Sequence, residues 1–278
     1  MSRNFLAMSS DGLESLPIEV SGQLLSQWMF IRRSSAQLLY EIQSIALSDS
    51  FPLTSRYLHG VFCSSTPSFR ACYLLGRVLF QDSLNVFTKA LRYPLCTEEV
   101  LDSFCRQLPS EYSPSSCDLP RRLFRSLAPK AKSSEWSEGD HPLPFLRYLY
   151  QSPQIPAPDA NAHDGYALTK AVHAKRPLLI QFLLDHGASP ACKNGLAVSV
   201  AIRQKDLQMV KLLIERDDIP FGRKMGKRKR RKLEDRLEVD REMLKMAVRC
   251  GARDIADYLI WEKGCIPDIE TLNVMTSP

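Results

Sequence analysis

Apolar residues recur at helical spacing in three segments of the second half of the chain, and these segments align with one another. They are ALTKAVHAKRPLLIQFLL (167–184), AVSVAIRQKDLQMVKLLI (197–214) and MLKMAVRCGARDIADYLI (243–260). Each contains a pair of small or apolar residues four positions apart, then a short gap, then an apolar residue, two spacers and two further apolar residues. Both patterns are typical of the buried face of a helix. The sequence therefore predicts three antiparallel helix pairs, each joined by a tight turn.

Residues suited to turns lie between these predicted pairs. The stretch DANAHDGYALTKA (159–171) begins with Asp159 and Asn161, whose side chains can bond to nearby backbone, and contains Gly165, which accepts a positive φ. His186-Gly187-Ala188 places a glycine where a left-handed cap would end the second helix. These features resemble the ankyrin repeat, a helix pair followed by a hairpin loop at a period of about 33 residues. A degenerate unit precedes the three, because the second-helix pattern occurs 34 residues earlier, at Leu146, Leu149 and Tyr150.

The chain departs from the repeat pattern at the start of each first helix. The Thr-Pro-Leu-His of the family is replaced by Tyr-Ala-Leu-Thr at 166–169, Leu-Ala-Val-Ser at 196–199 and Glu-Met-Leu-Lys at 242–245. These repeats are therefore divergent, and we expect them to be less stable than typical ones. The resemblance implies that loop tips and inner helices bind a protein partner through Asn161, His163, Asp164, Tyr166, Lys193, Asn194, Leu196, Arg241 and Glu242.

An insertion interrupts the repeat spacing and contains the densest charge of the chain. Ala171 and Ala201 are 30 residues apart, whereas Ala201 and Ala247 are 46 apart. The extra residues include FGRKMGKRKRRKLEDR (221–236), so the net charge of +6 is concentrated in one loop. Such a run is read in three ways: a solvated loop, a signal for an import receptor, or a contact with RNA or DNA phosphates. We favour a nuclear-import signal within 223–232, formed by Lys227, Arg228, Lys229, Arg230, Arg231 and Lys232.

The first half of the chain also shows helical spacing, but without a clean repeat. Residues 38–75 predict three short helices broken at Pro52 and Pro67. With Leu38, Ile42 and Ile45 in the first helix, this segment resembles a degenerate F-box, the module that docks on the adaptor of cullin-type ubiquitin ligases. The Leu-Pro that opens the family pattern is absent directly before Leu38.

Composition and motifs are typical of an ordinary globular protein with no recognisable catalytic centre. The chain has 278 residues, 44% hydrophobic and 24% charged. Eight scattered cysteines without a CxxC pair predict reduced thiols of an intracellular protein. We find no phosphate-binding glycine loop, nucleophile elbow, metal-binding motif or membrane-length apolar run, and expect no cofactor, no bound metal and no membrane contact.

These observations predict an all-α protein, a short ankyrin-type helix-pair solenoid preceded by an irregular helical region. We expect it to be a non-catalytic adaptor for an unidentified protein partner in the nucleus, the cytoplasm or both. Two alternatives stay open: a substrate receptor of a ubiquitin ligase, and a nucleic-acid-associated factor that uses the basic loop. The expected divisions are an N-terminal arm with a short helix (1–35), a helical region (36–128), a polar linker (129–142), divergent repeats (143–215), a basic inserted loop (216–239), and a terminal repeat with its tail (240–278).

Overall fold

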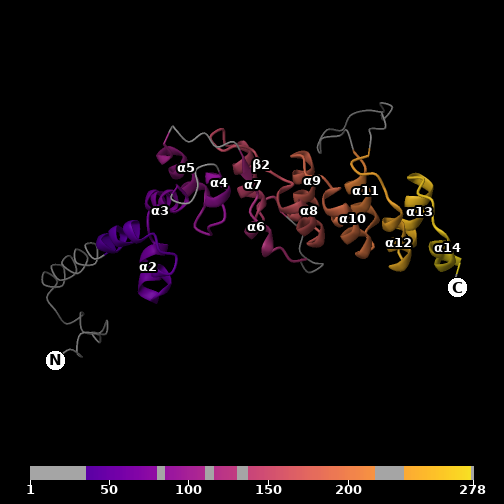
Figure 1. Ribbon diagram of the computed structural model, residues 1–278, viewed down its shortest axis with the longest axis horizontal. Coiled ribbons are helices and arrows are strands. Elements are labelled where there is room, and N and C mark those ends of the chain that lie inside the picture. Colours follow the sequence, from indigo (N-terminus) through magenta and orange to yellow (C-terminus); the bar gives the residue numbers. More distant parts are fainter. Residues whose placement is uncertain (1–35, 80–84, 110–115, 130–136, 217–234, 277–278) are drawn as a thin grey trace, which may run out of the picture.

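The computed structural model describes residues 36–79, 85–109, 116–129, 137–216 and 235–276, and most of these residues are helical. The all-α expectation is confirmed at this level. Two strands of two residues each, β1 (Cys117–Asp118) and β2 (Pro158–Asp159), pair in parallel. The helices follow one another along the long axis of an elongated molecule (Figure 1).

Short helices form the N-terminal part of the described chain. A helix spanning 36–46 is followed by η2 (Phe51–Leu53), α2 (Arg56–Cys63), α3 (Pro67–Leu79), α4 (Val86–Ala90), α5 (Glu98–Gln107) and α6 (Arg122–Arg125). The hydroxyl of Ser55 accepts a hydrogen bond from the Leu58 N–H at 3.1 Å and so caps α2. Pro67 starts α3, where a missing N–H costs no helical hydrogen bond.

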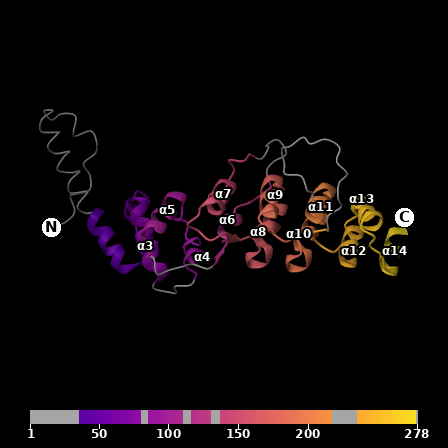
Figure 2. The same ribbon diagram turned by 90° about the horizontal axis from the view of Figure 1, so that it is seen from above.

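The remaining described helices alternate between two rows. One row consists of α7 (Leu143–Gln151), α9 (Pro177–Asp185), α11 (Leu207–Ile214) and α13 (Arg253–Asp257), the last continuing into a short π-helical segment, η3 (Tyr258–Glu262). The other row consists of α6, α8 (Ala162–His173), α10 (Cys192–Arg203) and α12 (Arg241–Arg249). Figure 2 shows both rows, with α14 (Ile269–Thr276) at the C-terminal end.

Identical backbone turns join the two helices of successive pairs. Lys175, Lys205 and Gly251 have φ values of 52°, 55° and 66°, and each follows the last turn of its first helix. The next N–H reaches back to the carbonyl of a buried alanine: Arg176 to Ala171 (3.1 Å), Asp206 to Ala201 (3.3 Å) and Ala252 to Ala247 (3.0 Å). These bonds satisfy carbonyls that a helix end leaves open. The three pairs therefore share one local geometry despite their different sequences.

A continuous apolar core lies between the two rows. Ala171, Ala201 and Ala247 are completely buried, as are Leu183, Leu213 and Leu259 at matching positions of the second helices. The same cluster extends into the N-terminal part through Phe87, Phe104 and Leu146. The small alanine side chains let neighbouring first helices approach closely, and the leucines fill the space behind them.

The ends of the insertion are pinned together where the described chain stops and resumes. The Arg236 N–H donates to the Ile214 carbonyl at 2.8 Å. The amino group of Lys263 lies 2.8 Å from a carboxylate oxygen of Asp235 and 3.5 Å from one of Glu215. Residues 217–234, which include the basic run, lie outside the described residues. The described residues on either side of 217–234 are thus held together at one point.

Two glycines with positive φ provide a direct test of the hairpin geometry. A Cβ on Gly165 (φ 68°) would lie 2.7 Å from the Cβ of Cys192, whereas one on Gly187 (φ 85°) would meet nothing within 4 Å. Gly187→Ala adds only left-handed strain, about 1–2 kcal/mol. Gly165→Ala adds the same strain and overpacking, for a total of roughly 2–5 kcal/mol.

Urea unfolding of both variants measures the difference in the free energy of unfolding. Equal losses for the two variants would contradict the close approach of the hairpin to Cys192.

Candidate functional site

Two matching hairpins form one edge of the helix stack. Residues 163–165 have φ values of 59°, 60° and 68°, and residues 193–195 have 54°, 55° and 69°. Three consecutive left-handed residues reverse the chain just before each first helix. The side chains of Asp164, Lys193 and Asn194 are exposed at the tips, and His163 is half-buried. This reversal uses left-handed backbone. Asp164 and Asn194 at the tips, and Gly165 and Gly195 at the third position, are residue types that tolerate positive φ.

Asn161 has a structural role within the chain. Its amide Nδ2 donates to the Gly187 carbonyl at 3.0 Å, and its Oδ1 accepts from the Ser189 N–H at 2.7 Å. The thiol of Cys192 lies 3.5 Å from the same oxygen. The amide therefore ties the first hairpin to the loop that opens the next unit. This half-buried side chain is used inside the stack, and its expected role in partner binding stays a prediction.

Tyr166 and Leu196 begin the helical part of α8 and α10, and both are half-buried. The guanidinium of Arg121 lies 5.5 Å from the centroid of the Tyr166 ring, and the amino group of Lys170 lies 5.9 Å from it. Cations at these distances are attracted to an aromatic face. The ring is thus flanked by two positive charges that the spacing of apolar residues did not indicate.

The third unit starts differently from the first two. Of the described residues directly before α12, 235–240, none has a positive φ, and the Asp240 carboxylate accepts a hydrogen bond from the Met243 N–H at 2.9 Å. Arg241 and Glu242 are exposed on the first turn of α12. They lie on a capped helix and not at a loop tip, and their expected role in partner binding stays a prediction.

The helix α14 packs against α12 and is fixed by one ion pair. Lys245 lies 2.8 Å from a carboxylate oxygen of Asp268 and 3.4 Å from one of Glu242. The hydrogen bond from Lys245 holds the pKa of the Asp268 carboxyl well below its usual range. Asp268 also accepts from the Thr271 N–H at 2.8 Å, which caps α14. This contact places a terminal helix beside the third unit.

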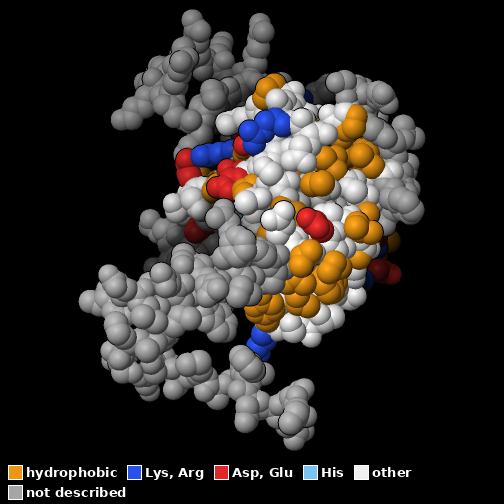
Figure 3. All heavy atoms as spheres, turned by 90° about the vertical axis from the view of Figure 1, so that its left-hand side faces the viewer, with side chains coloured by type: hydrophobic (Ala, Val, Ile, Leu, Met, Phe, Trp, Pro, Cys, Tyr) orange, Lys and Arg blue, Asp and Glu red, His pale blue; other side chains and the backbone are white. Residues whose placement is uncertain are grey.

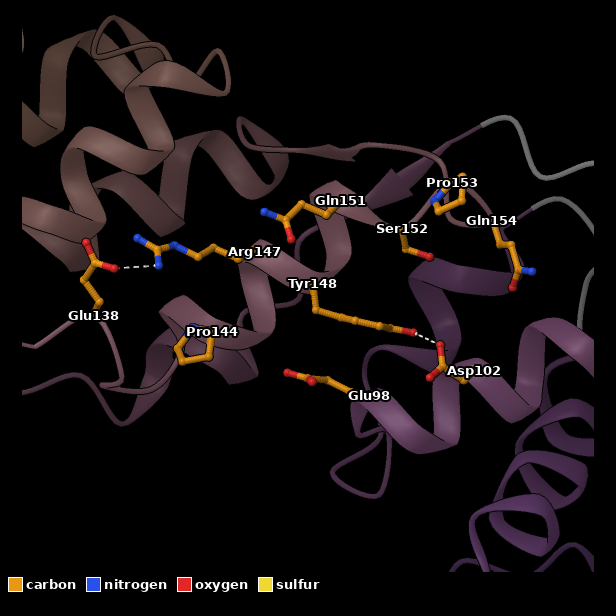
Figure 4. Close-up of a pocket in the computed structure, with 10 residues that line it drawn as sticks. All are labelled: Glu98, Asp102, Glu138, Pro144, Arg147, Tyr148, Gln151, Ser152, Pro153 and Gln154. Carbon is orange, nitrogen blue, oxygen red and sulfur yellow. Dashed lines mark hydrogen bonds and ion pairs between the residues drawn. The ribbon is translucent and has the colours of Figure 1, made fainter. Parts of the chain in front are cut away.

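A polar cleft of about 700 Å³ lies between α5 and α7 (Figure 4). The Tyr148 hydroxyl bonds to Asp102 at 2.5 Å, and Arg147 pairs with Glu138 at 2.8 Å. Burial, followed by the bond to Asp102, raises the pKa of Tyr148 above its ordinary value. The Tyr148–Asp102 bond thus joins the two helices across the cleft, whereas Arg147 pairs with Glu138 on one side of it (Figure 4). The other lining residues are Glu98, Pro144, Gln151, Ser152, Pro153 and Gln154.

The cysteines and histidines do not gather into a reactive or metal-binding cluster within the described residues. All eight cysteines are free thiols, and burial raises the pKa of both Cys96 and Cys117 to about 12. A thiol with so high a pKa is protonated and unreactive near neutral pH. Of the helices that the structure describes, none has the length and apolar character needed to cross a bilayer.

The sequence also contains a regular spacing of basic residues and histidine. Counted from the repeated alanine, the second and fourth positions are basic or imidazole in most units, and the structure exposes them along one edge. The import-signal residues 227–232 lie outside the described residues, so their expected role stays a prediction.

A scan against protein-family models and searches of curated proteins and solved structures found no match.

Proposed function

We propose that the chain is a non-catalytic adaptor that binds another protein through an ankyrin-type helix stack. One observation supports this most strongly: the hairpin geometry of residues 163–165 recurs 30 residues later at 193–195. Two equivalent tips project from equivalent units that share a core. Repetition of this kind produces an extended surface whose side chains differ from unit to unit.

The rigidity of the hairpins favours binding. Gly165 and Gly195 are buried, and the Asn161 amide bonds link the first hairpin to the next unit. A surface that is already ordered loses little conformational entropy when a partner binds. The exposed tips Asp164, Lys193 and Asn194 would then contact the partner directly. Tyr166 and Leu196 lie behind them as the large side chains that most often dominate binding energy.

The test is a charge change at the two tips. The double variant Asp164→Lys/Asn194→Lys leaves the backbone conformation intact, because lysine already adopts the left-handed region at Lys175 and Lys193. We expect partner recovery in affinity capture to fall at least roughly tenfold, since a misplaced charge at an interface costs several kcal/mol.

The matched control is Glu99→Lys on α5, where the side chain is exposed away from the hairpins. A partner that is retained by the tip variant as well as by the control would contradict the proposed binding surface.

A second candidate function rests on the N-terminal end of the described chain. Leu38, Ile42 and Ile45 are 59%, 50% and 85% exposed on the helix 36–46, so an apolar stripe faces solvent. Figure 3, which views this end, shows apolar side chains gathered on its surface. The stripe supports the alternative that these helices dock on a ubiquitin-ligase adaptor. Affinity capture tests this alternative with the triple variant Leu38→Glu/Ile42→Glu/Ile45→Glu. The alternative is favoured if the wild-type chain and the tip variant recover adaptor and cullin and the triple variant does not.

The basic insertion supports a role in nuclear import. Its ends are pinned by Arg236, Asp235 and Lys263, so changes within residues 217–234 leave the described core untouched. Replacing Lys227, Arg228, Lys229, Arg230, Arg231 and Lys232 with Ala should move a fluorescent fusion out of the nucleus without changing helix content.

An unrelated import signal appended to this variant should restore nuclear fluorescence. A fusion that stays nuclear after the six substitutions would contradict the proposed signal. Salt-sensitive binding of total RNA that is lost in the same variant would instead favour the nucleic-acid alternative.

A further inference from the structure

The turns between the first and second helices form a second edge of the stack, opposite the hairpins. The relevant turns are 140–142, 173–176, 203–206 and 249–252. Adjacent turns contact one another. Arg176 donates to the His141 carbonyl, and Gln204 donates to the His173 carbonyl at 3.0 Å. The amino group of Lys205 lies 3.8 Å from the position that a Cβ on Gly251 would take. We name this contiguous edge the turn row.

Five side chains of the turn row are exposed and basic or imidazole. They are His173, Lys175, Arg203, Lys205 and Arg249. In the parts of the chain that the structure describes, none of these five forms an ion pair with a carboxylate. Two acids also lie in the row: the Asp206 carboxylate accepts from the Met209 N–H at 3.0 Å and caps α11, and the Asp140 carboxylate accepts from the Ser137 N–H at 3.0 Å. The exposed cations Lys175, Arg203, Lys205 and Arg249 outnumber these acids, so the edge is positively charged.

Helix ends account for part of this charge but not for all of it. Arg203 and Arg249 end their helices, where a cation interacts favourably with the macrodipole. Lys175 and Lys205 lie beyond the helices at φ 52° and 55°, where the equivalent residue of the third unit is Gly251. A lysine in this region costs about 1–2 kcal/mol relative to an ordinary conformation. A glycine at either position would relieve this strain. The presence of lysine instead indicates that the two amino groups have a function.

The spacing of these charges suits an extended chain. Packed helices lie roughly 8–10 Å apart, so the cations of successive units recur at about this distance: Lys175 in the first unit, Arg203 and Lys205 in the second, and Arg249 in the third. A peptide in the extended polyproline II conformation has three residues per turn and rises roughly 3.1 Å per residue, so every third side chain lies on the same face at intervals of about 9 Å. We propose that the turn row binds an extended acidic peptide segment whose carboxylates occur at every third residue.

Nucleic acid fits this edge less well than an acidic peptide. Along a DNA duplex the phosphates of one strand recur about every 3.4 Å of helix axis, roughly three times more densely than the cations of successive units. The five side chains include no Phe, Tyr or Trp on which a base could stack. At one end of the row, burial, followed by the nearby Arg122 and Arg176, lowers the pKa of His141.

The turn row is separate from the surface assigned to the proposed function. The hairpins precede the first helices, and the turns follow them. From Tyr166 to His173 the helix rises roughly 10 Å. Binding at the turn row therefore does not depend on the tips, and failure of one assignment leaves the other intact.

The test uses two fluorescein-labelled peptides of identical composition and the full chain. One peptide has the sequence (Ser-Gly-Glu)₄, and the other has its four glutamates clustered at one end. Fluorescence anisotropy should show tighter binding of the regularly spaced peptide. The basic insertion contributes the same non-specific attraction to both, so the difference between the isomers reports the row.

Substitution at the row should abolish this difference. In Arg203→Gln/Lys205→Gln we expect roughly two- to thirtyfold weaker binding of the spaced peptide, the effect of two exposed ion pairs. Arg56→Gln/Arg92→Gln removes the same charge elsewhere and should change binding less than roughly twofold. Lys175→Gly/Lys205→Gly should weaken binding without lowering the thermal midpoint, because glycine relieves the left-handed strain.

Equal binding of the two isomers, or an unchanged affinity in the row variants, would overturn the assignment. So would a lower thermal midpoint of the glycine variant with unchanged affinity, which would show that the lysines serve stability alone. A single-stranded RNA of equal charge that binds more tightly than the spaced peptide, and is lost in Arg203→Gln/Lys205→Gln, would also overturn it in favour of nucleic acid.

Discussion

The close contact between neighbouring first helices is the constraint on which the rest of the described C-terminal half depends. The first helices α8, α10 and α12 pack against one another, and one alanine on each (Ala171, Ala201 and Ala247) is fully buried. Helices of this length are marginal on their own, so each pair is stable only when the next one covers it. This contact sets the distance between units, and that distance in turn sets the spacing of the hairpins on one edge and of the turns on the other.

The two edges differ in what they present, although the same repeat produces both. The hairpin edge carries mixed side chains on strained but well-fixed backbone, with Asn161 bonding across to Gly187 and Ser189. The turn row carries mainly positive charge. Specific protein recognition needs varied, ordered groups, whereas a row of similar charges selects a partner by charge and spacing. We therefore expect the tips to decide partner identity and the turn row to engage an acidic segment.

The helix pairs were predictable because their apolar positions follow helical periodicity, and Gly187 was predictable because only glycine is suited to its φ of 85°. The hairpin geometry was only partly so. Asp164 and Gly165 indicated a turn, but lysine has no preference for positive φ, so the left-handed conformation of Lys193 could not be predicted. The tie made by Asn161 and the stacking of Arg121 on Tyr166 join residues far apart in sequence, and no local pattern reports such contacts. The described residues before α12 form no left-handed hairpin. The sequence did not indicate this difference, because an aspartate such as Asp240 is equally suited to a turn and to a helix cap.

Removal of the insertion tests the central claim that the third helix pair belongs to the same stack as the first two. Ile214 and Arg236 are hydrogen-bonded at 2.8 Å, so residues 217–234 can be replaced by a two-glycine link between Arg216 and Asp235. Urea unfolding of this shortened chain, followed by tryptophan fluorescence and circular dichroism together, should show one transition with its midpoint unchanged. Two separate transitions, or loss of α12 and α13 helicity, would show that the third pair depends on the insertion and not on α10.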